Sequence, residues 1–469
     1  MSKKPALNAD QEEAFRIIKN FLASADDTLV LQGYAGTGKT FLMQHLGKWL
    51  TKREMPFSML ASTGRAATVL RGKTGFETKT VHSELYSFSK VDGVEDNMPD
   101  NAPVDAYGQM SLQFALRQPD EEKKLYIVDE ASMLASETGN GLSMVSFGSG
   151  LLMKDFFAAV GSNKVIFVGD PCQLPPVGQL SSPALDLNWL NENGRHPVFV
   201  QLNKIERNAD DNDILLLAAA VREMVDIEQE MSFPKLPASN INSVELYADE
   251  KELFNSYLEK YRKVGYNGAL AITRSNKKVG IINRAIRRDL HGELDMPLQP
   301  NDVLLVVQNN YAVPLANGDF CEVVSIGETR MKAGLNFLNI KLKALLSGEE
   351  YDVLLSLDIL YGTENNFSQE QQRRLMIDFH DRMREKKIRP NSEQYKKKMM
   401  SDPYLNCLRA KYGYAVTGHK AQGGEWDHVF LFLDKQMYGM PRPELYRWWY
   451  TAITRTRLKL HLANAWWVG

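Results

Sequence analysis

The chain has 469 residues, of which 44% are hydrophobic and 24% are charged. This composition is typical of a folded globular protein and excludes an intrinsically disordered or collagen-like chain. Its 56 lysines and arginines nearly balance its 58 aspartates and glutamates, and the net charge of −2, taken as a sum, argues against a partner as acidic as nucleic acid.

The length predicts about three domains. No apolar run reaches the roughly 20 residues that a bilayer requires, and the first residues lack the apolar segment of a signal peptide, so no membrane partner is expected. None of the three cysteines forms a CxxC pair, which argues against a disulfide framework and a structural zinc site. We therefore expect a reduced, cytoplasmic protein.

The first part of the chain, to about residue 201, alternates short apolar runs with amphipathic helices, the pattern of a parallel α/β sheet. Polar or small residues follow several of these runs, and open α/β sheets bind ligands at the carboxyl ends of their strands. Between residues 83 and 123 the alternation breaks into an acidic stretch followed by a helix, which we interpret as an insert. The expected strands are 28–32, 58–62, 124–129 and 164–169, and the expected helix after the first strand is 41–52.

A second α/β block begins near residue 198, is interrupted, and resumes near residue 413. The interruption begins with a strand-rich stretch, 302–360, in which Asn317-Gly318-Asp319 is a turn signal typical of a small antiparallel barrel. A charged, helical stretch at 367–402 follows it. The expected elements of the block itself are helices 213–224 and 277–290 and strands 270–273 and 458–463.

The strongest local signal is the run from Gly33 to Thr40, which matches GxxxxGK[ST] between a strand and a helix. In such a loop the backbone N–H groups of Gly36, Thr37 and Gly38 wrap phosphates at a helix N-terminus, where the helix dipole favours negative charge. Lys39 would contact the β- and γ-phosphates, and the Thr40 hydroxyl would bind Mg²⁺. The run therefore predicts a nucleoside-triphosphate site with ATP and Mg²⁺ as cofactors.

A site of this kind needs a carboxylate at a strand end to complete magnesium coordination. Asp129 and Glu130 supply it, because they follow the apolar strand predicted at 124–129. Asp129 would bind Mg²⁺ through water, and Glu130 would orient or deprotonate the attacking water.

Two arginines of the second block suggest a second lobe that acts on the nucleotide. Arg455 lies near the end of the chain, on a helix expected before the last strand, and Arg207 lies at the start of the block. An arginine that reaches the γ-phosphate from another lobe stabilises the transition state and couples lobe closure to the nucleotide.

With these motifs in place, the chain resembles the superfamily 1 helicases, specifically the RecD/Dda-type 1B branch that moves 5′ to 3′. The resemblance covers nearly the whole chain in the right order. Residues 8–11 resemble the Q motif, the P-loop and Asp129-Glu130 resemble motifs I and II, and 61–67 resemble motif Ia. Residues 80–82 resemble the segment before the family's pin, and 168–176, 414–425 and 450–457 resemble motifs III, V and VI.

The resemblance assigns roles to single residues. Gln11 would contact adenine, Gln173 would sense the γ-phosphate, and Glu425 would approach the nucleotide from the second lobe, with Arg207 and Arg455 as arginine fingers. Where relatives often carry a histidine or an aromatic residue in motif Ia, this chain has Gly64-Arg65, so Arg65 becomes a candidate phosphate contact. The other expected contacts to single-stranded DNA are Thr63, Thr80, His82, Thr417 and His419.

The resemblance also implies an architecture. We expect two RecA-like P-loop lobes in an α/β fold, with a small pin insert in the first lobe and an SH3-like β-barrel plus helical insert in the second. The expected boundaries are 1–83 and 119–197 for the first lobe, 84–118 for the pin, 198–300 and 406–469 for the second lobe, and 301–405 for its insert.

Aromatic and basic residues of the inserts are further candidates for DNA contact. Tyr86, Phe88 and Phe114 are each either a base-stacking wedge of the pin or a part of its core. Residues 367–402 carry ten Lys or Arg against six Asp or Glu, a local charge of +4. We therefore expect Lys396, Lys397 and Lys398 to contribute to DNA binding.

The predicted function is an ATP-dependent DNA helicase that translocates 5′ to 3′ on single-stranded DNA and unwinds a duplex with a 5′ tail. Two alternatives stay open: a RecD-like subunit of a larger recombination or repair complex, and a P-loop ATPase switch without strand movement. We expect a monomer in the cytoplasm of a bacterial or phage-infected cell, with replication or recombination proteins as partners.

Overall fold

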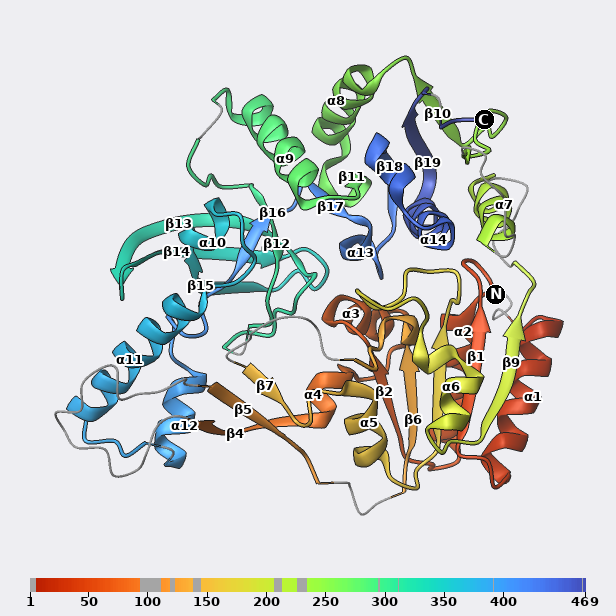
Figure 1. The fold of residues 1–469 in the computed structure, drawn as a ribbon, viewed down its shortest axis with the longest axis horizontal. Helices are drawn as coiled ribbons and strands as arrows, with labels where there is room; N and C mark the ends of the chain where they lie inside the picture. Colours follow the sequence, from red (N-terminus) through yellow and green to blue (C-terminus); the bar gives the residue numbers. More distant parts are fainter. Residues whose placement is uncertain are drawn as a thin grey trace.

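The protein, seen in a computed structural model, consists of two parallel α/β lobes with an antiparallel insert beside them (Figure 1). The first lobe occupies the lower half of the view and the second lobe the upper right, with the insert of the second lobe on the left. The structure describes residues 6–92, 111–118, 123–137, 145–205, 213–225, 234–293, 296–310, 312–390, 392–465 and 467–469.

The first lobe is built on a six-stranded parallel sheet with the strand order β3-β2-β6-β8-β1-β9. The strands inside the sheet, β1, β6 and β8, are mostly apolar because both faces of the sheet are covered. Leu29 and Leu31 of β1 pack into the same core cluster as Phe15 and Leu42 of the neighbouring helices, whereas Val30 packs into the opposite cluster. The strands are β1 (Thr28–Gly33), β2 (Phe57–Ala61), β3 (Thr78–Thr80), β6 (Leu125–Asp129), β8 (Val165–Gly169) and β9 (Pro197–Leu202), and the helices are α1 (Ala9–Ala23), α2 (Lys39–Lys52), α3 (Gly64–Thr74), α4 (Val81–Leu85), α5 (Leu152–Val160) and α6 (Leu187–Glu192).

The four strands and the first helix predicted for this lobe are therefore confirmed, but the lobe ends later than expected. β9 pairs with β1 over residues 197–202, and these residues belong to the first sheet and not to a second lobe that begins at 198. The alternating Val198, Val200 and Leu202 bury one face of the strand against the helices of the first lobe.

The insert of the first lobe is a small sheet of β4 (Tyr86–Asp92), β5 (Ser111–Leu116) and β7 (Val145–Phe147). The helix expected before residue 123 is wrong, because Phe114 and Leu116 alternate with polar or small residues at the two-residue period of a strand. β7 also joins this sheet, so the insert extends beyond its predicted end at 118.

The aromatic candidates of the pin are packed in this sheet and around it. Tyr86 and Phe114 are buried in the core of the first lobe, and the Tyr86 hydroxyl donates to Asp155 at 2.8 Å. Phe88 packs against Phe114, with 5.5 Å between the ring centres, and also against the helical part of the second lobe's insert. Figure 1 shows the contact region, where α12 lies beside β4 and β5.

The second lobe is a five-stranded parallel sheet with the order β10-β19-β18-β11-β17. Its largest side chains, among them Trp426, Trp448 and Tyr257, are fully buried in one cluster. The elements are β10 (Val244–Tyr247), β11 (Ala269–Thr273), β17 (Ala415–Thr417), β18 (Trp426–Phe432), β19 (Thr456–Ala463), α7 (Ile214–Val225), α8 (Glu250–Gly268), α9 (Asn276–His291), α13 (Gly418–Ala421) and α14 (Arg442–Ile453).

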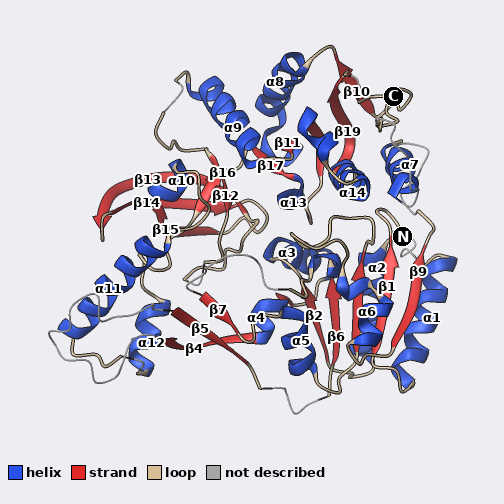
Figure 2. Ribbon diagram, viewed as in Figure 1, coloured by secondary structure: helices blue, strands red, loops and turns tan. Residues whose placement is uncertain are grey.

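The insert of the second lobe is a five-stranded antiparallel sheet followed by helices (Figure 2). The predicted turn at Asn317-Gly318 joins its first two strands, with Gly318 in the left-handed region at φ +99°. β16 pairs with β12, so the sheet reaches past the predicted boundary at 405. The strands are β12 (Val303–Val306), β13 (Phe320–Lys332), β14 (Leu335–Ala344), β15 (Glu350–Ser356) and β16 (Ala410–Tyr412), and the helices are α10 (Leu357–Tyr361), α11 (Gln369–Glu385) and α12 (Glu393–Met400).

A buried ion pair joins this insert to the second lobe. Arg287 of α9 donates to both carboxylate oxygens of Asp302, at 3.0 and 2.9 Å, and the Tyr414 hydroxyl donates to the same carboxylate at 2.6 Å. Asp302 is fully buried and directly precedes β12. The connection between lobe and insert therefore depends on a desolvated charge pair.

Among the described residues, no helix combines the length and apolarity that crossing a membrane requires.

We predict that Asp302→Ala destabilises the protein strongly, because it leaves the guanidinium of Arg287 buried without its carboxylate, a loss of about 3–5 kcal/mol. Urea unfolding followed by circular dichroism would measure the change. Asp352→Ala is the matched control, since Asp352 pairs with Lys341 on the surface of the same insert and its loss should leave the midpoint nearly unchanged. Equal shifts for the two variants would contradict the prediction.

Candidate functional site

The loop between β1 and α2 has the geometry of a phosphate-binding loop. Gly36 and Gly38 have φ angles of +82° and +79°, a left-handed conformation that a residue with a side chain adopts only at a cost. α2 begins at Lys39, directly after Gly38. The ammonium of Lys39 donates to the carbonyls of Gly33, at 2.5 Å, and Tyr34, at 3.0 Å, so its positive charge lies within the loop.

Gln11 touches this loop from its buried side. It is the third residue of α1 and completes a capping box with Asn8. Its side-chain amide donates to the carbonyl of Thr37 at 3.3 Å, and both residues are buried. The structure thus brings the predicted adenine contact to the P-loop, while the contact with adenine itself stays a prediction.

Two carboxylates stand at the end of β6, as predicted. Burial raises the pKa of Asp129, and the negative charge of Glu130 raises it further, while Lys39 and Lys73 oppose the shift. Glu130 has a φ angle of +49°, which is rare for a residue with a long side chain and is typical of strained functional positions. A positive group beside Asp129 would relieve this unfavourable charge.

A cavity of about 610 Å³ collects the predicted nucleotide residues of both lobes. Its volume is within the range of small-molecule and cofactor sites. The predicted residues that line it are Gly36, Gly38, Lys39, Thr40, Asp129, Glu130 and Gln173 from the first lobe and Glu425 and Arg455 from the second.

Arg455 lies after the end of α14 and not on the helix, which ends at Ile453. Its guanidinium donates to the carbonyls of Thr451 and Gly424, at 3.0 and 3.3 Å, and it is almost completely buried. The packing of the last helix therefore fixes where this charge enters the cavity. Arg207, the other predicted arginine finger, lies outside the described residues.

The loop that follows β8 is held by the second lobe. Tyr450 of α14 donates to Asp170 at 2.7 Å and accepts from the backbone N–H of Ala35 in the P-loop at 3.0 Å. Two residues of the second lobe bond to the backbone of Leu174: Thr451 accepts from its N–H at 3.0 Å, and Gln422 donates to its carbonyl at 3.2 Å. Each contact joins the first lobe to the second.

Gln173 lies between these contacts. It is almost fully buried, it lines the cavity, and its side-chain oxygen has no hydrogen-bond partner among the described residues. Buried polar atoms are nearly always hydrogen-bonded, so the amide is placed to bond with a polar ligand of the cavity.

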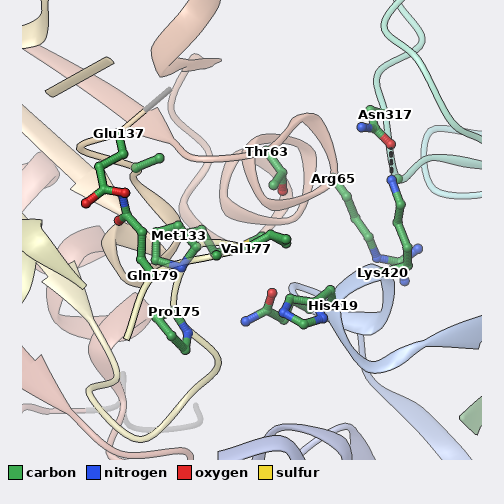
Figure 3. Close-up of a pocket in the computed structure, with 15 residues that line it drawn as sticks. Thr63, Arg65, Met133, Glu137, Pro175, Val177, Gln179, Asn317, His419 and Lys420 are labelled. Carbon is green, nitrogen blue, oxygen red and sulfur yellow. Dashed lines mark hydrogen bonds between the residues drawn. The ribbon is translucent and has the colours of Figure 1, made fainter. Parts of the chain in front are cut away.

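A second cavity, of about 430 Å³, opens where the two lobes and the insert meet (Figure 3). Thr63 and Arg65 enter it from α3, His419 and Lys420 from the second lobe, and Asn317 from the insert. The opposite wall comes from the first lobe. It is apolar at Met133, Pro175, Pro176 and Val177 and polar at Glu137 and Gln179. Its apolar part lies across from the polar groups of the second lobe and the insert, which suits a strand with a polar backbone and apolar base faces.

The predicted DNA contacts divide into two groups. Thr63, Arg65 and His419 line this second cavity, whereas Thr80, His82 and Thr417 do not. The Thr80 side chain accepts from the N–H of Ser83 at the start of α4. The ring of His82 packs against Tyr86 and Phe147, and burial lowers its pKa. The lysines of α12 line neither cavity, and their contribution to DNA binding stays a prediction.

Several cavity residues were not predicted from the sequence. Lys420 and Asn317, which are hydrogen-bonded to each other, line the second cavity, and Lys73 and Arg457 line the first. Lys420 and Arg457 lie beside predicted residues in the same motifs, and this could have indicated them. Asn317 was recognised only as a turn residue, and nothing local distinguishes Lys73.

Comparison with known proteins agrees with this geometry. Residues 6–229 match a family model described as an AAA domain, and residues 412–463 match the UvrD-like helicase C-terminal domain. An ATP-dependent DNA helicase Pif1 of Psychrobacter sp. (strain PRwf-1) is 24% identical over 64% of this chain and 44% of its own length.

Over these matched regions the chain is similar to helicases of the Pif1 type. Its fold resembles that of a Pif1 helicase from a structure of two coordinating Pif1 helicases that unwind forked double-stranded DNA, with a TM-score of 0.50, 16% identity, and 98% of this chain and 92% of the other covered. It also resembles a Bacteroides Pif1 bound to single-stranded DNA, with a TM-score of 0.50, 14% identity, and 98% and 93% covered. The chain spans less than half the length of the curated Pif1 helicases that it matches.

We predict that Tyr450→Phe loosens the junction between the lobes. The change leaves the Asp170 carboxylate and the Ala35 N–H without their shared partner, a cost of about 1–3 kcal/mol. Thermal unfolding should show a lower midpoint, and a fluorescent ATP analogue should bind more weakly. Tyr446→Phe, one turn earlier on α14, is the control. A midpoint unchanged in Tyr450→Phe would refute the importance of the shared hydroxyl.

Proposed function

We propose that the chain is an ATP-dependent DNA helicase that translocates 5′ to 3′ along single-stranded DNA. One observation carries the proposal: residues of both lobes line the cavity that contains the P-loop, and Arg65 lines both that cavity and the second one. A nucleotide in the first cavity would draw the lobes together, and this movement would change the grip on a strand in the second. The 5′-to-3′ direction rests on the resemblance to the 1B branch.

The residues of the first cavity suit ATP and Mg²⁺. Thr40 and Asp129 would hold the ion, which neutralises phosphate charge when bound. Within the described ranges, no group of three or more His, Cys, Asp or Glu side chains could bind a metal. Lys39 would contact the phosphates, Gln173 and Arg455 would meet the γ-phosphate, and Glu130 would take a proton from the attacking water.

The second cavity suits a single strand that is bound without reading its sequence. Hydroxyl, imidazole and ammonium groups can bond phosphate oxygens, and the Pro175–Val177 side offers apolar contact to bases. Forked DNA, which a structural relative unwinds, is the duplex substrate that we infer. We also infer that the five-stranded insert is the SH3-like module of this branch.

The alternatives predict other outcomes. A RecD-like subunit would hydrolyse ATP but need partner subunits to unwind DNA. A P-loop switch would show no stimulation of its ATPase by single-stranded DNA.

The test is strand displacement by the purified chain on duplexes with a 5′ tail, a 3′ tail or no tail. We expect ATP-dependent displacement on the 5′-tailed duplex alone, and an ATPase that single-stranded DNA stimulates. DNA-stimulated ATPase without displacement would favour the RecD-like subunit. An ATPase indifferent to DNA would exclude the helicase.

Glu130→Gln tests the chemical step. The amide cannot accept the proton of the attacking water, so we expect hydrolysis to fall by about 10²- to 10⁴-fold, the usual contribution of a general base. Binding of ATP and of single-stranded DNA should persist in the variant, as measured by fluorescence anisotropy. Turnover at the wild-type rate would remove Glu130 from the mechanism.

A further inference from the structure

The guanidinium of Arg65 lies among three aromatic side chains that all come from outside its own lobe. It donates to the Tyr266 hydroxyl at 3.0 Å, and its central carbon lies 4.8 Å from the ring centre of Trp426 and 4.9 Å from that of Phe320. Tyr266 is near the end of α8 and Trp426 begins β18, both in the second lobe, while Phe320 begins β13 of the insert. One side chain of the first lobe thus contacts both other parts of the molecule.

The three rings form a preorganised platform. All three are buried, and the ring centres of Tyr266 and Phe320 lie 4.4 Å apart. A planar guanidinium can stack on aromatic faces and is weakly hydrated, whereas the lysine ammonium is a strongly hydrated point charge. The platform therefore suits arginine in particular.

The backbone around Arg65 is also shaped for close approach. A Cβ atom on Gly424 would lie 2.5 Å from the Arg65 guanidinium and 2.4 Å from the Trp426 ring. A Cβ atom on Gly64 would lie 1.9 Å from that of Ala316 in the insert. Glycine on both sides of the contact lets α3 pack against the second lobe and the insert at once.

This contact lies between the two cavities. Arg65 lines both of them, and Gly424 and Glu425, which adjoin the contact, line the nucleotide cavity. The Nε atom of Arg65 is buried and has no hydrogen-bond partner among the described residues. The side chain is half-buried, and its guanidinium is engaged by the Tyr266 hydroxyl and the rings of Phe320 and Trp426.

We propose that Arg65 is a positioning residue that clamps the first lobe to the second lobe and the insert, and is not the phosphate contact expected from motif Ia. The clamp holds the closed arrangement in which both cavities are complete. The role of this clamp in the ATPase cycle rests on the proposed function.

The experiment compares Arg65→Lys, which keeps the charge, with Arg65→Gln, which removes it. Cysteines introduced at Asn20 of α1 and Lys277 of α9, both exposed, would carry a dye pair across the lobes, since the native cysteines are buried. Energy transfer with and without a non-hydrolysable ATP analogue reports closure. Single-stranded DNA affinity without nucleotide, measured at several salt concentrations, reports phosphate contacts.

We expect both variants to close less on the analogue and to lose about tenfold in kcat of the DNA-stimulated ATPase, the effect of one desolvated cation–π contact. Their DNA affinity and its salt dependence should match the wild type. Phe320→Leu, which removes part of the platform and leaves Arg65 intact, should reproduce the loss of closure. Arg71→Lys and Arg71→Gln, at an exposed arginine of the same helix, are the controls.

Two results would overturn the proposal. In the first, Arg65→Lys behaves as the wild type while Arg65→Gln weakens DNA binding and reduces the salt slope by about one, the signature of a phosphate contact. In the second, all variants close normally. Absence of DNA stimulation in the wild type would instead reject the proposed function, while the closure measurement, which contains no DNA, would still test the clamp.

Discussion

The hydroxyl of Tyr450 is the interaction on which the arrangement of the nucleotide cavity depends. It joins the P-loop backbone at Ala35 to the buried carboxylate of Asp170, and it does so from the last helix of the other lobe. A buried polar group left unpaired is costly, so the loss of this hydroxyl would destabilise both the P-loop N–H and the carboxylate oxygen that it bonds. The same helix carries Thr451, which bonds to Leu174, and leads directly to Arg455. The position of Gln173 and Arg455, the residues proposed to meet the γ-phosphate, is therefore a property of the interface and not of either lobe alone.

The net charge says little about the partner because the charges that matter are local. Asp129 and Glu130 face Lys39, Lys73, Arg455 and Arg457 in one cavity, and Lys420 and His419 stand in the other. A chain near neutrality can hold both anionic ligands if each cation is placed in a cavity, where low dielectric strengthens its effect. The proposed translocation requires release of the strand in every cycle, and a uniformly basic surface would oppose that release.

The sequence predicts those elements whose signal lies in a local pattern of residues. The P-loop, the strand ending in Asp129 and the helices 213–224 and 277–290 follow from apolar periodicity and glycine placement, and the structure has them. The predicted boundaries at 198 and 405 separate β9 and β16 from their sheets, because a short strand carries no local sign of its partner, which tertiary pairing decides. The helix expected between the acidic stretch and residue 123 is wrong, because the two-residue period of β5 extends over only six residues and is easily missed. The aromatic surroundings of Arg65 could not be predicted for a related reason. Tyr266, Phe320 and Trp426 lie far apart in sequence, and only the fold brings them together.

The two cavities share a wall, and this has a mechanical consequence. α3 carries Thr63 at its start, facing the second cavity, and Lys73 near its end, facing the first. A rigid helix that borders both cavities cannot move relative to one without moving relative to the other, because packed elements shift as units. The glycines at 64, 423 and 424 bring the backbones of α3, the insert and the second lobe into contact at its first turn. Closure of the lobes over a nucleotide must therefore move the first turn of α3, and this turn also forms part of the wall of the second cavity.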